Sequence, residues 1–348
     1  MLSKVSAWVL IGFLFVSSQF CGDAQESDRT ALFAKAAGEK IIPKQPSVRG
    51  DDKDWLFLVR ELRQISLGKF WEKPWEEVAA NGTNPVPSMV EFHELLAAKG
   101  IDLIIVPVPA KASIYPEKLA TDFALEDSLA LSPFIGEMRT AGLTVIDLEP
   151  LMKTWRTEHP ERKIYCEQDA HFSPFGCEMI AASLASELEG VKQAGSIELG
   201  VSAETTIQIE GDQVKDSKWA GEIGSEELTI TYAGKKTAGA STTPLEPSED
   251  SPVLLLGDSH TLVFQEGKGA GMHCKGAGLF DHISASVGYP LDVVGVRGSG
   301  LMQARKQLFY KAVEIDGYWA KKEVVIWVFS VREFTQSVDK IISVPLER

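Results

Sequence analysis

Two short motifs carry the residue types of a nucleophilic catalytic site. A Gly-Asp-Ser-His run at 257–260 directly follows an apolar run at 252–256. A buried strand that ends in such a tight turn lifts a serine hydroxyl, here that of Ser259, above the edge of a sheet. Upstream, Asp169 and His171 are separated by a single residue. Because the order of triad residues along the chain differs between folds, the two motifs together predict a Ser-His-Asp triad.

The predicted chemistry is attack of a serine on an ester carbonyl. His171 takes the proton of Ser259, while Asp169 orients the imidazole and stabilises its charged form. The backbone N–H of Ser259 and that of Gly298 or Gly300 are candidates to receive the oxyanion, and losing one such donor costs about 3–4 kcal/mol. Taken singly, each motif has a plainer interpretation, as a turn or as a helix cap beside a surface histidine.

Further candidates follow from the rule that ligands bind at the carboxyl ends of parallel strands. The residues predicted there to bind substrate are Lys111, Arg297, Gly298 and Arg332. The alternative is that these charges are simply solvated. His260 is a second candidate base, although a neighbour of the nucleophile rarely reaches its hydroxyl. The histidines without a partner pattern are interpreted as structural: His93, His159, His273 and His282.

Strands and helices alternate along most of the chain. Strands are predicted at 101–108, 143–148, 253–256, 291–296 and 323–329, and helices at 89–98, 174–188, 279–287 and 301–313. For the helix at 174–188, Ser173 is the expected N-cap and Pro174 the first helical residue. This alternation favours an α/β fold with three α/β/α layers and a mostly parallel sheet.

One stretch breaks the alternation. Residues 195–245 are rich in Thr and Ile with a period of two, which predicts a small antiparallel β insertion. Residues 25–50 are polar and are interpreted as a leader into the fold. We therefore expect one domain over 25–348, with the insertion inside it, rather than two domains.

The N-terminus predicts export. Residues 1–24 combine Lys4, a short apolar core and small residues up to Ala24, as a signal peptide does. The alternatives are an uncleaved anchor and, less favoured, a lipid on Cys21. The formal net charge of −14 argues against nucleic-acid partners, because phosphate contacts need clustered Lys and Arg.

Three cysteines remain beyond the predicted signal peptide. A Cys166–Cys177 bridge would pin the Asp-x-His motif, and free buried thiols are the equal alternative. Cys274 is the third, so all three cannot pair within one chain. No metal is expected, because neither a Cys-x-x-Cys nor a His-x-x-x-His spacing occurs.

Several segments resemble one known family, the SGNH-hydrolase-like O-acetyltransferases of the AlgJ/AlgX type. The segments that carry the resemblance lie at 54–57, 106–111, 114–116, 169–173, 256–260 and 326–334. In that family the Asp-x-His and Gly-Asp-Ser residues form the triad, which implies the same role for Asp169, His171 and Ser259. Asp54 departs from the family's usual Gly, and a second, carbohydrate-binding domain of the AlgX type is not expected.

The resemblance implies an exported, periplasmic O-acetyltransferase that needs no cofactor. It implies two partners: a polysaccharide acceptor, and a membrane-bound O-acyltransferase that supplies acetyl groups. Two other functions stay open at this point. A carbohydrate acetylesterase would use the same triad with water as the acceptor, and a polysaccharide-binding scaffold subunit would not use Ser259 at all.

Overall fold

A five-stranded parallel sheet forms the centre of the computed structural model, which describes residues 29–192, 197–215, 217–237, 239 and 241–347. In spatial order its strands are β11 (Asp292–Gly295), β10 (Val253–Gly257), β12 (Val324–Ser330), β3 (Asp102–Val108) and β4 (Thr144–Val145). All four pairings are parallel. The carboxyl ends of the strands therefore meet at one edge, where their following loops can form a site.

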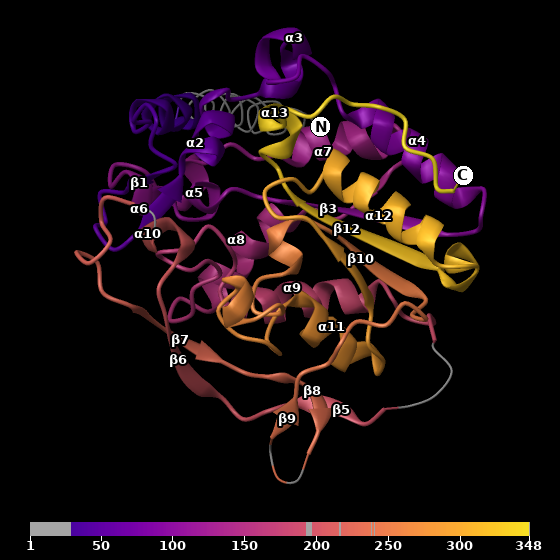
Figure 1. The fold of residues 1–348 in the computed structure, drawn as a ribbon. Helices are drawn as coiled ribbons and strands as arrows, with labels where there is room; N and C mark the ends of the chain where they lie inside the picture. The colour runs from indigo at the N-terminus through magenta and orange to yellow at the C-terminus, as the bar shows by residue number, and fades with distance from the viewer. Residues whose placement is uncertain (1–28, 193–196, 216, 238, 240, 348) are drawn as a thin grey trace, which may run out of the picture.

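Helices cover both faces of the sheet (Figure 1). One face packs on α4 (Val86–Ala97), α7 (Ser132–Thr140) and α12 (Met302–Glu314). The other packs on α8 (Leu148–Glu158), α9 (Pro174–Ser186) and α11 (Leu279–Val287). Successive residues of β10 alternate between the two cores, Leu254 and Leu256 in one and Leu255 in the other. This double burial explains why the strands are continuous apolar runs. The three-layer α/β/α prediction is confirmed.

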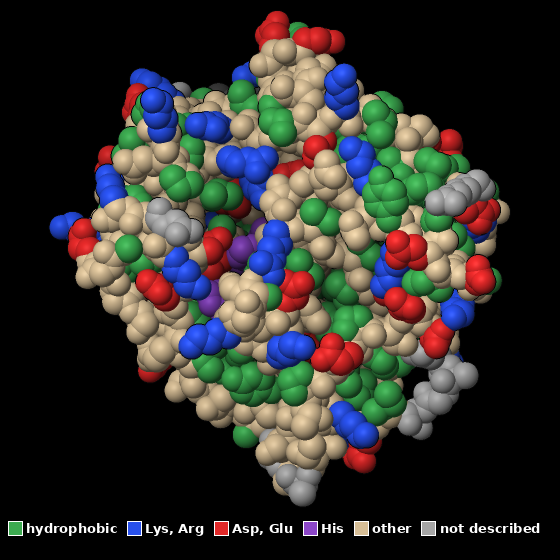
Figure 2. Space-filling view, viewed as in Figure 1, with side chains coloured by type: hydrophobic (Ala, Val, Ile, Leu, Met, Phe, Trp, Pro, Cys, Tyr) green, Lys and Arg blue, Asp and Glu red, His purple; other side chains and the backbone are tan. Residues whose placement is uncertain are grey.

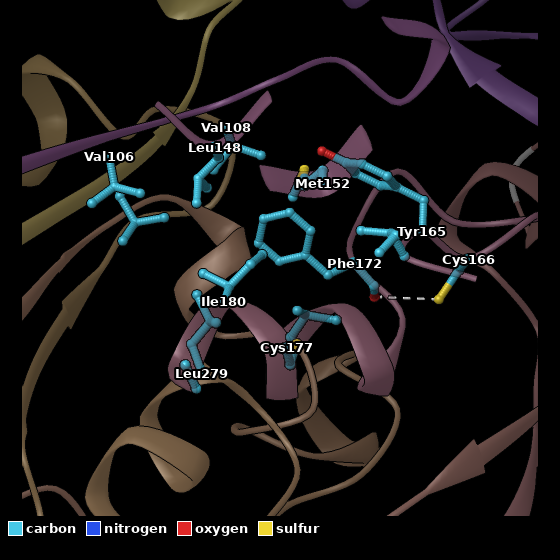
Figure 3. Close-up of a cluster of buried hydrophobic side chains, with 14 of the residues drawn as sticks. Val106, Val108, Leu148, Met152, Tyr165, Cys166, Phe172, Cys177, Ile180 and Leu279 are labelled. Carbon is cyan, nitrogen blue, oxygen red and sulfur yellow. Dashed lines mark hydrogen bonds between the residues drawn. The ribbon is translucent and has the colours of Figure 1, made fainter. Parts of the chain in front are cut away.

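One core cluster includes Phe172, the residue that follows His171 (Figure 3). The Phe172 ring lies between Met152 of α8 and the residues Cys177 and Ile180 of α9, and it is fully buried. The Cys166 thiol donates to the Phe172 carbonyl at 3.3 Å. Burying a phenylalanine contributes about 1.5–3 kcal/mol, so this side chain anchors the segment that carries its neighbour, His171.

The predicted β insertion is present and antiparallel. Its elements are β5 (Leu199–Val201), β6 (Thr205–Ile209), α10 (Asp212–Lys215), β7 (Glu226–Ile230), β8 (Ala233–Lys236) and β9 (Thr242–Thr243). β6 pairs with β7, and β5, β8 and β9 form a separate small sheet. The insertion lies along the α9 and α11 side of the molecule (Figure 1). The short helix α10 was not predicted.

Short elements surround the carboxyl edge of the central sheet. They are β1 (Ser47–Arg49), β2 (Leu56–Leu58), α2 (Val59–Ser66), α3 (Trp75–Val78), α5 (Lys111–Ile114), α6 (Pro116–Leu119) and α13 (Glu333–Gln336). β1 and β2 pair antiparallel. α2 contacts both α5 and α13, so it connects the loops that follow β3 and β12.

Two sequence interpretations need correction. Residues 29–39, within the predicted leader, form a helix whose Phe33 and Ala37 are buried in the core, because these two residues share one helical face. The strand predicted at 143–148 is shorter, since only Thr144–Val145 form a strand and Leu148 already begins α8. This strand lies at the sheet edge and has one pairing partner, which leaves its length weakly determined.

The structure has free thiols at Cys166, Cys177 and Cys274. Cys166 and Cys177 therefore do not form the disulfide that was one of the two alternatives. The first two are fully buried. The predicted signal peptide at 1–24 lies outside the described residues. Among the residues that the structure describes, no helix has the length and apolar character needed to span a bilayer.

Candidate active site

Ser259 stands on a turn that only glycine permits. β10 ends at Gly257, where an added Cβ would lie 1.9 Å from the Val328 carbonyl oxygen of β12. After Gly257 the chain turns into a short 3-10 helix at Ser259–Thr261, capped by the Asp258 carboxylate. Ser259 keeps 8% of its surface exposed, so a substrate can reach a hydroxyl that the backbone holds in place.

The aspartate before the serine is structural. Asp258 is fully buried and accepts from the backbone N–H groups of His260 and Ser330, both at 2.9 Å. Burial favours its neutral form, but contact with His260 outweighs this and lowers the pKa of Asp258 well below its usual range. Its carboxylate therefore ties the serine turn to the end of β12.

His260 is occupied by this same carboxylate. Its Nδ1 lies 2.9 Å from Asp258 Oδ1, and burial lowers the pKa of His260. The ring is 3% exposed and packs on Phe172, with ring centroids 4.7 Å apart. The geometry that could make His260 the base is thus absent, because its partner is Asp258 rather than Ser259.

His171 meets the serine hydroxyl. Its Nε2 lies 2.7 Å from Ser259 Oγ, and its Nδ1 lies 2.5 Å from Asp169 Oδ1. The same carboxylate oxygen accepts the His171 backbone N–H at 3.0 Å. Ser173 caps α9 as predicted, by accepting the Gly176 N–H at 3.1 Å. The helix start therefore fixes the chain two residues beyond the imidazole, and the structure brings the three predicted triad residues together.

The charges of the Asp169–His171 pair reinforce one another. Burial disfavours both ions, but their mutual attraction outweighs it. Contact with His171 and His273 holds the pKa of Asp169 well below its usual range. The Asp169 carboxylate raises the pKa of His171 to about 9. The pair therefore stabilises an imidazolium, the form that a general base takes after it accepts a proton.

The second oxygen of Asp169 has two further donors. Oδ2 accepts the backbone N–H of Asp212 and Nε2 of His273, each at 2.9 Å. Asp212 comes from α10 in the insertion, and His273 from the loop that follows Ser259. Neither residue was predicted to belong to the site, and His273 was interpreted as structural. No local motif marks either residue, because each reaches Asp169 only through the tertiary fold.

The insertion grips the Asp169 loop by its backbone. An added Cβ at Gly211 would lie 2.0 Å from the Gln168 carbonyl oxygen. The Asp212 carboxylate accepts the Ala170 N–H at 3.0 Å. The Glu226 carboxylate accepts the backbone N–H groups of residues 167 and 168 at 2.9–3.1 Å. The predicted insertion is therefore part of the site's framework.

Lys111 has a different role from the predicted one. It was expected to bind substrate, but it is fully buried. Its ammonium donates to the carbonyls of Cys166, Glu167 and Asp169 at 2.8–3.1 Å, and to Gln213 Oε1 at 3.2 Å. Burial lowers the pKa of Lys111, and nearby carboxylates including Glu61 oppose this shift. Lys111 thus holds the Asp169 loop in shape and has no donor left for a substrate.

The other predicted substrate ligands have other partners in the structure. Arg332 is 5% exposed and donates to Glu333 at 2.6 Å, so it too is an internal charge rather than a surface ligand. Arg297 is exposed and pairs with Glu266. The Gly298 carbonyl accepts from Arg60 at 3.5 Å. Binding of substrate by Arg297 and Gly298 stays a prediction.

The site contains one set of groups with metal-ligand chemistry. Asp169, His171 and Asp212 each offer an atom within 4.8 Å of the others. The Asp169 and His171 atoms already bond to each other and to Ser259, His273 and the backbone. Hydrogen bonding therefore accounts for this cluster.

A hollow opens beside His273, which contacts Asp169. In Figure 2, histidine side chains lie at the bottom of a depression near the middle of the view, with Lys and Arg side chains at its rim. A cavity of about 440 Å³ borders His273. Its lining includes Ile207, Glu210, Lys215 and Lys268. The cavity thus lies between the β6–β7 hairpin and the loop that follows Ser259.

The three-layer α/β/α fold carries a Gly-Asp-Ser serine and an Asp-x-His pair at the carboxyl edge of its central sheet. These features define an SGNH hydrolase-like domain. A family model described as the SGNH hydrolase-like domain of the acetyltransferase AlgX matches residues 48–268. The chain belongs to this AlgX acetyltransferase family, as the sequence resemblance predicted.

Two curated relatives agree with this assignment. Over 146 residues, 41% of this chain, it is 29% identical to the "Probable alginate O-acetylase AlgJ" of Pseudomonas aeruginosa. Over 115 residues, 31% of this chain, it is 25% identical to the "Alginate biosynthesis protein AlgX" of Pseudomonas fluorescens. The matched segments cover 34% and 24% of those two proteins, so the chain matches only about a third or less of each relative's length.

Two solved structures share the fold. The O-acetyltransferase domain of Pseudomonas putida AlgJ aligns with a TM-score of 0.60 over 85% of this chain and 94% of that chain, at 19% identity. Pseudomonas aeruginosa AlgX aligns with a TM-score of 0.54 over 82% of this chain and 62% of that chain, at 17% identity. These likenesses confirm the predicted fold class.

Proposed function

We propose that this protein is an O-acetyltransferase that carries an acetyl group on Ser259 and passes it to a hydroxyl of an exopolysaccharide. The observation that carries the proposal is the unbroken series of contacts from Asp169 through His171 to the Ser259 hydroxyl. Membership of the acetyltransferase family supports this reading over a plain scaffold.

The reaction proceeds in two steps, acetylation of Ser259 and transfer of the acetyl group to the sugar. Ser259 Oγ attacks the acetyl carbonyl of the donor while His171 takes the hydroxyl proton, and collapse of the tetrahedral intermediate expels the donor's alcohol or thiol with that proton. A sugar hydroxyl then attacks the acetyl-serine and gives its proton to His171. Collapse of the second intermediate releases the acetylated sugar and returns the proton to Ser259.

The oxyanion of both intermediates needs hydrogen-bond donors. Ser259 opens a short 3-10 helix, and the first N–H groups of a helix have no acceptor within it. The Ser259 N–H is therefore the first donor we assign. Each such donor is worth about 3–4 kcal/mol to the transition state.

The proposed setting is the periplasm, reached by the signal peptide predicted at 1–24. The proposed partners are a polysaccharide acceptor and a membrane-bound O-acyltransferase that supplies acetyl groups across the membrane. The names of the two curated relatives, which refer to alginate, support an exopolysaccharide as the acceptor. The acetylated polymer would be the product in the cell.

The test compares the purified chain with its Ser259→Ala and His171→Ala variants on a chromogenic acetyl ester. Release of acetate that falls by at least about 10³-fold in both variants supports the triad. Ser186→Ala, at an exposed serine whose hydroxyl donates only to the Ser183 carbonyl at the end of α9, is the matched serine control. The acyl-enzyme is sought by mass spectrometry on the peptide that contains Ser259.

Adding oligosaccharide acceptors separates transfer from hydrolysis. Acetyl groups that appear on the sugar establish the transferase. Acetate released at the same rate with or without acceptor would instead establish an acetylesterase. A wild-type protein with neither turnover nor acetyl-serine, acceptors present, would overturn the enzyme proposal and favour a scaffold.

A further inference from the structure

Asp169 lies between two imidazoles. His171 approaches one carboxylate oxygen and His273 the other, at 2.5 and 2.9 Å. The side chain of His273 is 5% exposed and that of Asp169 is 1% exposed, so this contact is shielded from water. A buried hydrogen bond to a charged group is stronger than one between neutral groups, so this contact fixes the orientation of the carboxylate.

The loop that presents His273 is held in an uncommon conformation. Phe264 and His273 both have left-handed backbones, with φ of 57° and 61°. Such a conformation is strained in a bulky residue and persists only where surrounding contacts impose it. The Phe264 N–H donates to the Met272 carbonyl at 3.1 Å, and the Phe264 and His273 rings lie 5.2 Å apart. The loop is therefore closed in a way that aims one imidazole at Asp169.

We propose that His273 is a positioning residue of the triad: it holds the Asp169 carboxylate in the orientation that His171 requires. The loop of His273 begins five residues after Ser259, so it links the serine segment to the Asp-x-His segment across the site. The inference rests on the proposed function, because it assumes that Asp169 and His171 activate Ser259.

His273 and His171 share their surroundings with several charged groups. They include Asp169, Asp212, Asp258 and His260, whose ring lies 5.1 Å from that of His171, and the cavity that His273 borders is also lined by Glu210, Lys215 and Lys268. The Asp212 carboxylate lies 3.8 Å from His171 Nδ1. Burial and the neighbouring Asp169 raise the pKa of Asp212 to about 6. Above pH 6 its negative charge therefore favours the protonated form of His171.

This arrangement predicts a directional effect of His273→Ala. Without the second donor, Asp169 concentrates its charge on His171, so the pKa of His171 rises. The pH midpoint of kcat/KM for the acetyl ester moves up, and kcat falls about 10- to 100-fold as the carboxylate loses its fixed orientation. KM stays near its wild-type value. His273→Gln, which keeps an N–H donor near the Nε2 position, restores most of kcat.

Asp212→Asn predicts the opposite shift. The amide keeps an oxygen acceptor for the Ala170 N–H but removes the charge near His171. The pKa of His171 then falls, and the pH midpoint of kcat/KM moves down. Two neighbouring substitutions that move the midpoint in opposite directions cannot both act through general loss of structure.

The experiment measures these midpoints in the full chain, together with a titration of His171 by NMR of isotope-labelled histidine. His159→Gln, which changes a histidine packed on Phe175 outside the triad contacts, is the control. The proposal fails if His273→Ala keeps the wild-type kcat and midpoint. It also fails if kcat falls only in step with the unfolding temperature while the midpoint stays fixed. If the wild type does not turn over, the NMR titration decides: a shifted His171 midpoint supports His273 although the proposed function is then wrong.

Discussion

At the scale of single residues, the proposed mechanism makes the pH dependence follow from the base strength of His171. A general base must be neutral before it can take a proton, and contact with Asp169 raises the pKa of His171 to about 9 despite burial. We expect kcat/KM for an acetyl ester to rise with pH through a midpoint above 6.5, up to about 9. A pH–rate profile measured with an acetyl ester that does not hydrolyse spontaneously over this pH range checks the expectation. A profile that is flat from pH 6 to 9 contradicts it.

The triad residues could be predicted from sequence, but the residues that hold them could not. Ser259 and His171 sit in local motifs whose geometry follows from a strand, a turn and a helix cap. Lys111 donates mostly to backbone carbonyls, and because every residue has a carbonyl, such contacts cannot be recognised from residue types. His273 reaches Asp169 from 104 positions away. A residue type without a local partner pattern therefore does not reveal such contacts, and only the predicted substrate role of Lys111 needs correction.

At the scale of elements, the docking of α10 on the Asp169 loop depends on Gly211. The substitution Gly211→Ala forces its Cβ into the Gln168 backbone, 2.0 Å away, so α10 must move. We expect a loss of about 1–3 kcal/mol in the free energy of unfolding and a clear fall in kcat. Thermal unfolding and ester hydrolysis measure the two effects.

The control for this prediction lies in the same insertion. An added Cβ at Gly224 meets no heavy atom within 4 Å, so Gly224→Ala should leave stability and kcat close to wild type. Equal losses in the two variants would mean that the insertion tolerates no alanine at all. That result would contradict the explanation that Gly211 is required because its backbone lies against that of Gln168.

The predictions for the elements were best where a pattern repeats. The strands β10 and β12 and the helix α9 lie close to their predicted ranges, since double burial and a Ser-Pro helix start are strong signals. The strands of the insertion were predicted from their period of two, but their docking onto the site was not. A period reports which face of a strand is buried, not what covers that face.

At the scale of the whole molecule, a buried charge cluster far from the triad contacts ties the sheet edge to its helices. Asp292 of β11 is fully buried and bonds to Lys311, Tyr318 and Lys322 at 2.6–3.0 Å. The substitution Asp292→Asn leaves the buried Lys322 ammonium without a countercharge. We expect a loss of about 3–5 kcal/mol in the free energy of unfolding, with kcat of the folded protein retained.

Urea denaturation measures this loss, with Asp250→Asn as the matched control. Asp250 pairs with Lys321 at the surface, where ion pairs contribute little, so its substitution should barely change the unfolding midpoint. Similar midpoints for the two variants would show that burial of the Asp292 cluster does not matter for stability.

The position of β12 has a consequence for when this protein can become active. It is the last strand in sequence, yet it lies between β10 and β3 in the middle of the sheet. It also provides the Ser330 N–H that holds Asp258 beside the nucleophile. Until β12 has been synthesised, the sheet beneath Ser259 lacks its central strand, and the Asp258 carboxylate lacks the Ser330 N–H, even if the preceding segments have already folded. Under the proposed function, Ser259 therefore becomes reactive only after residues 324–330 have been made and have joined the sheet, and a truncated product that ends before residue 324 carries Asp169, His171 and Ser259 in an inactive form.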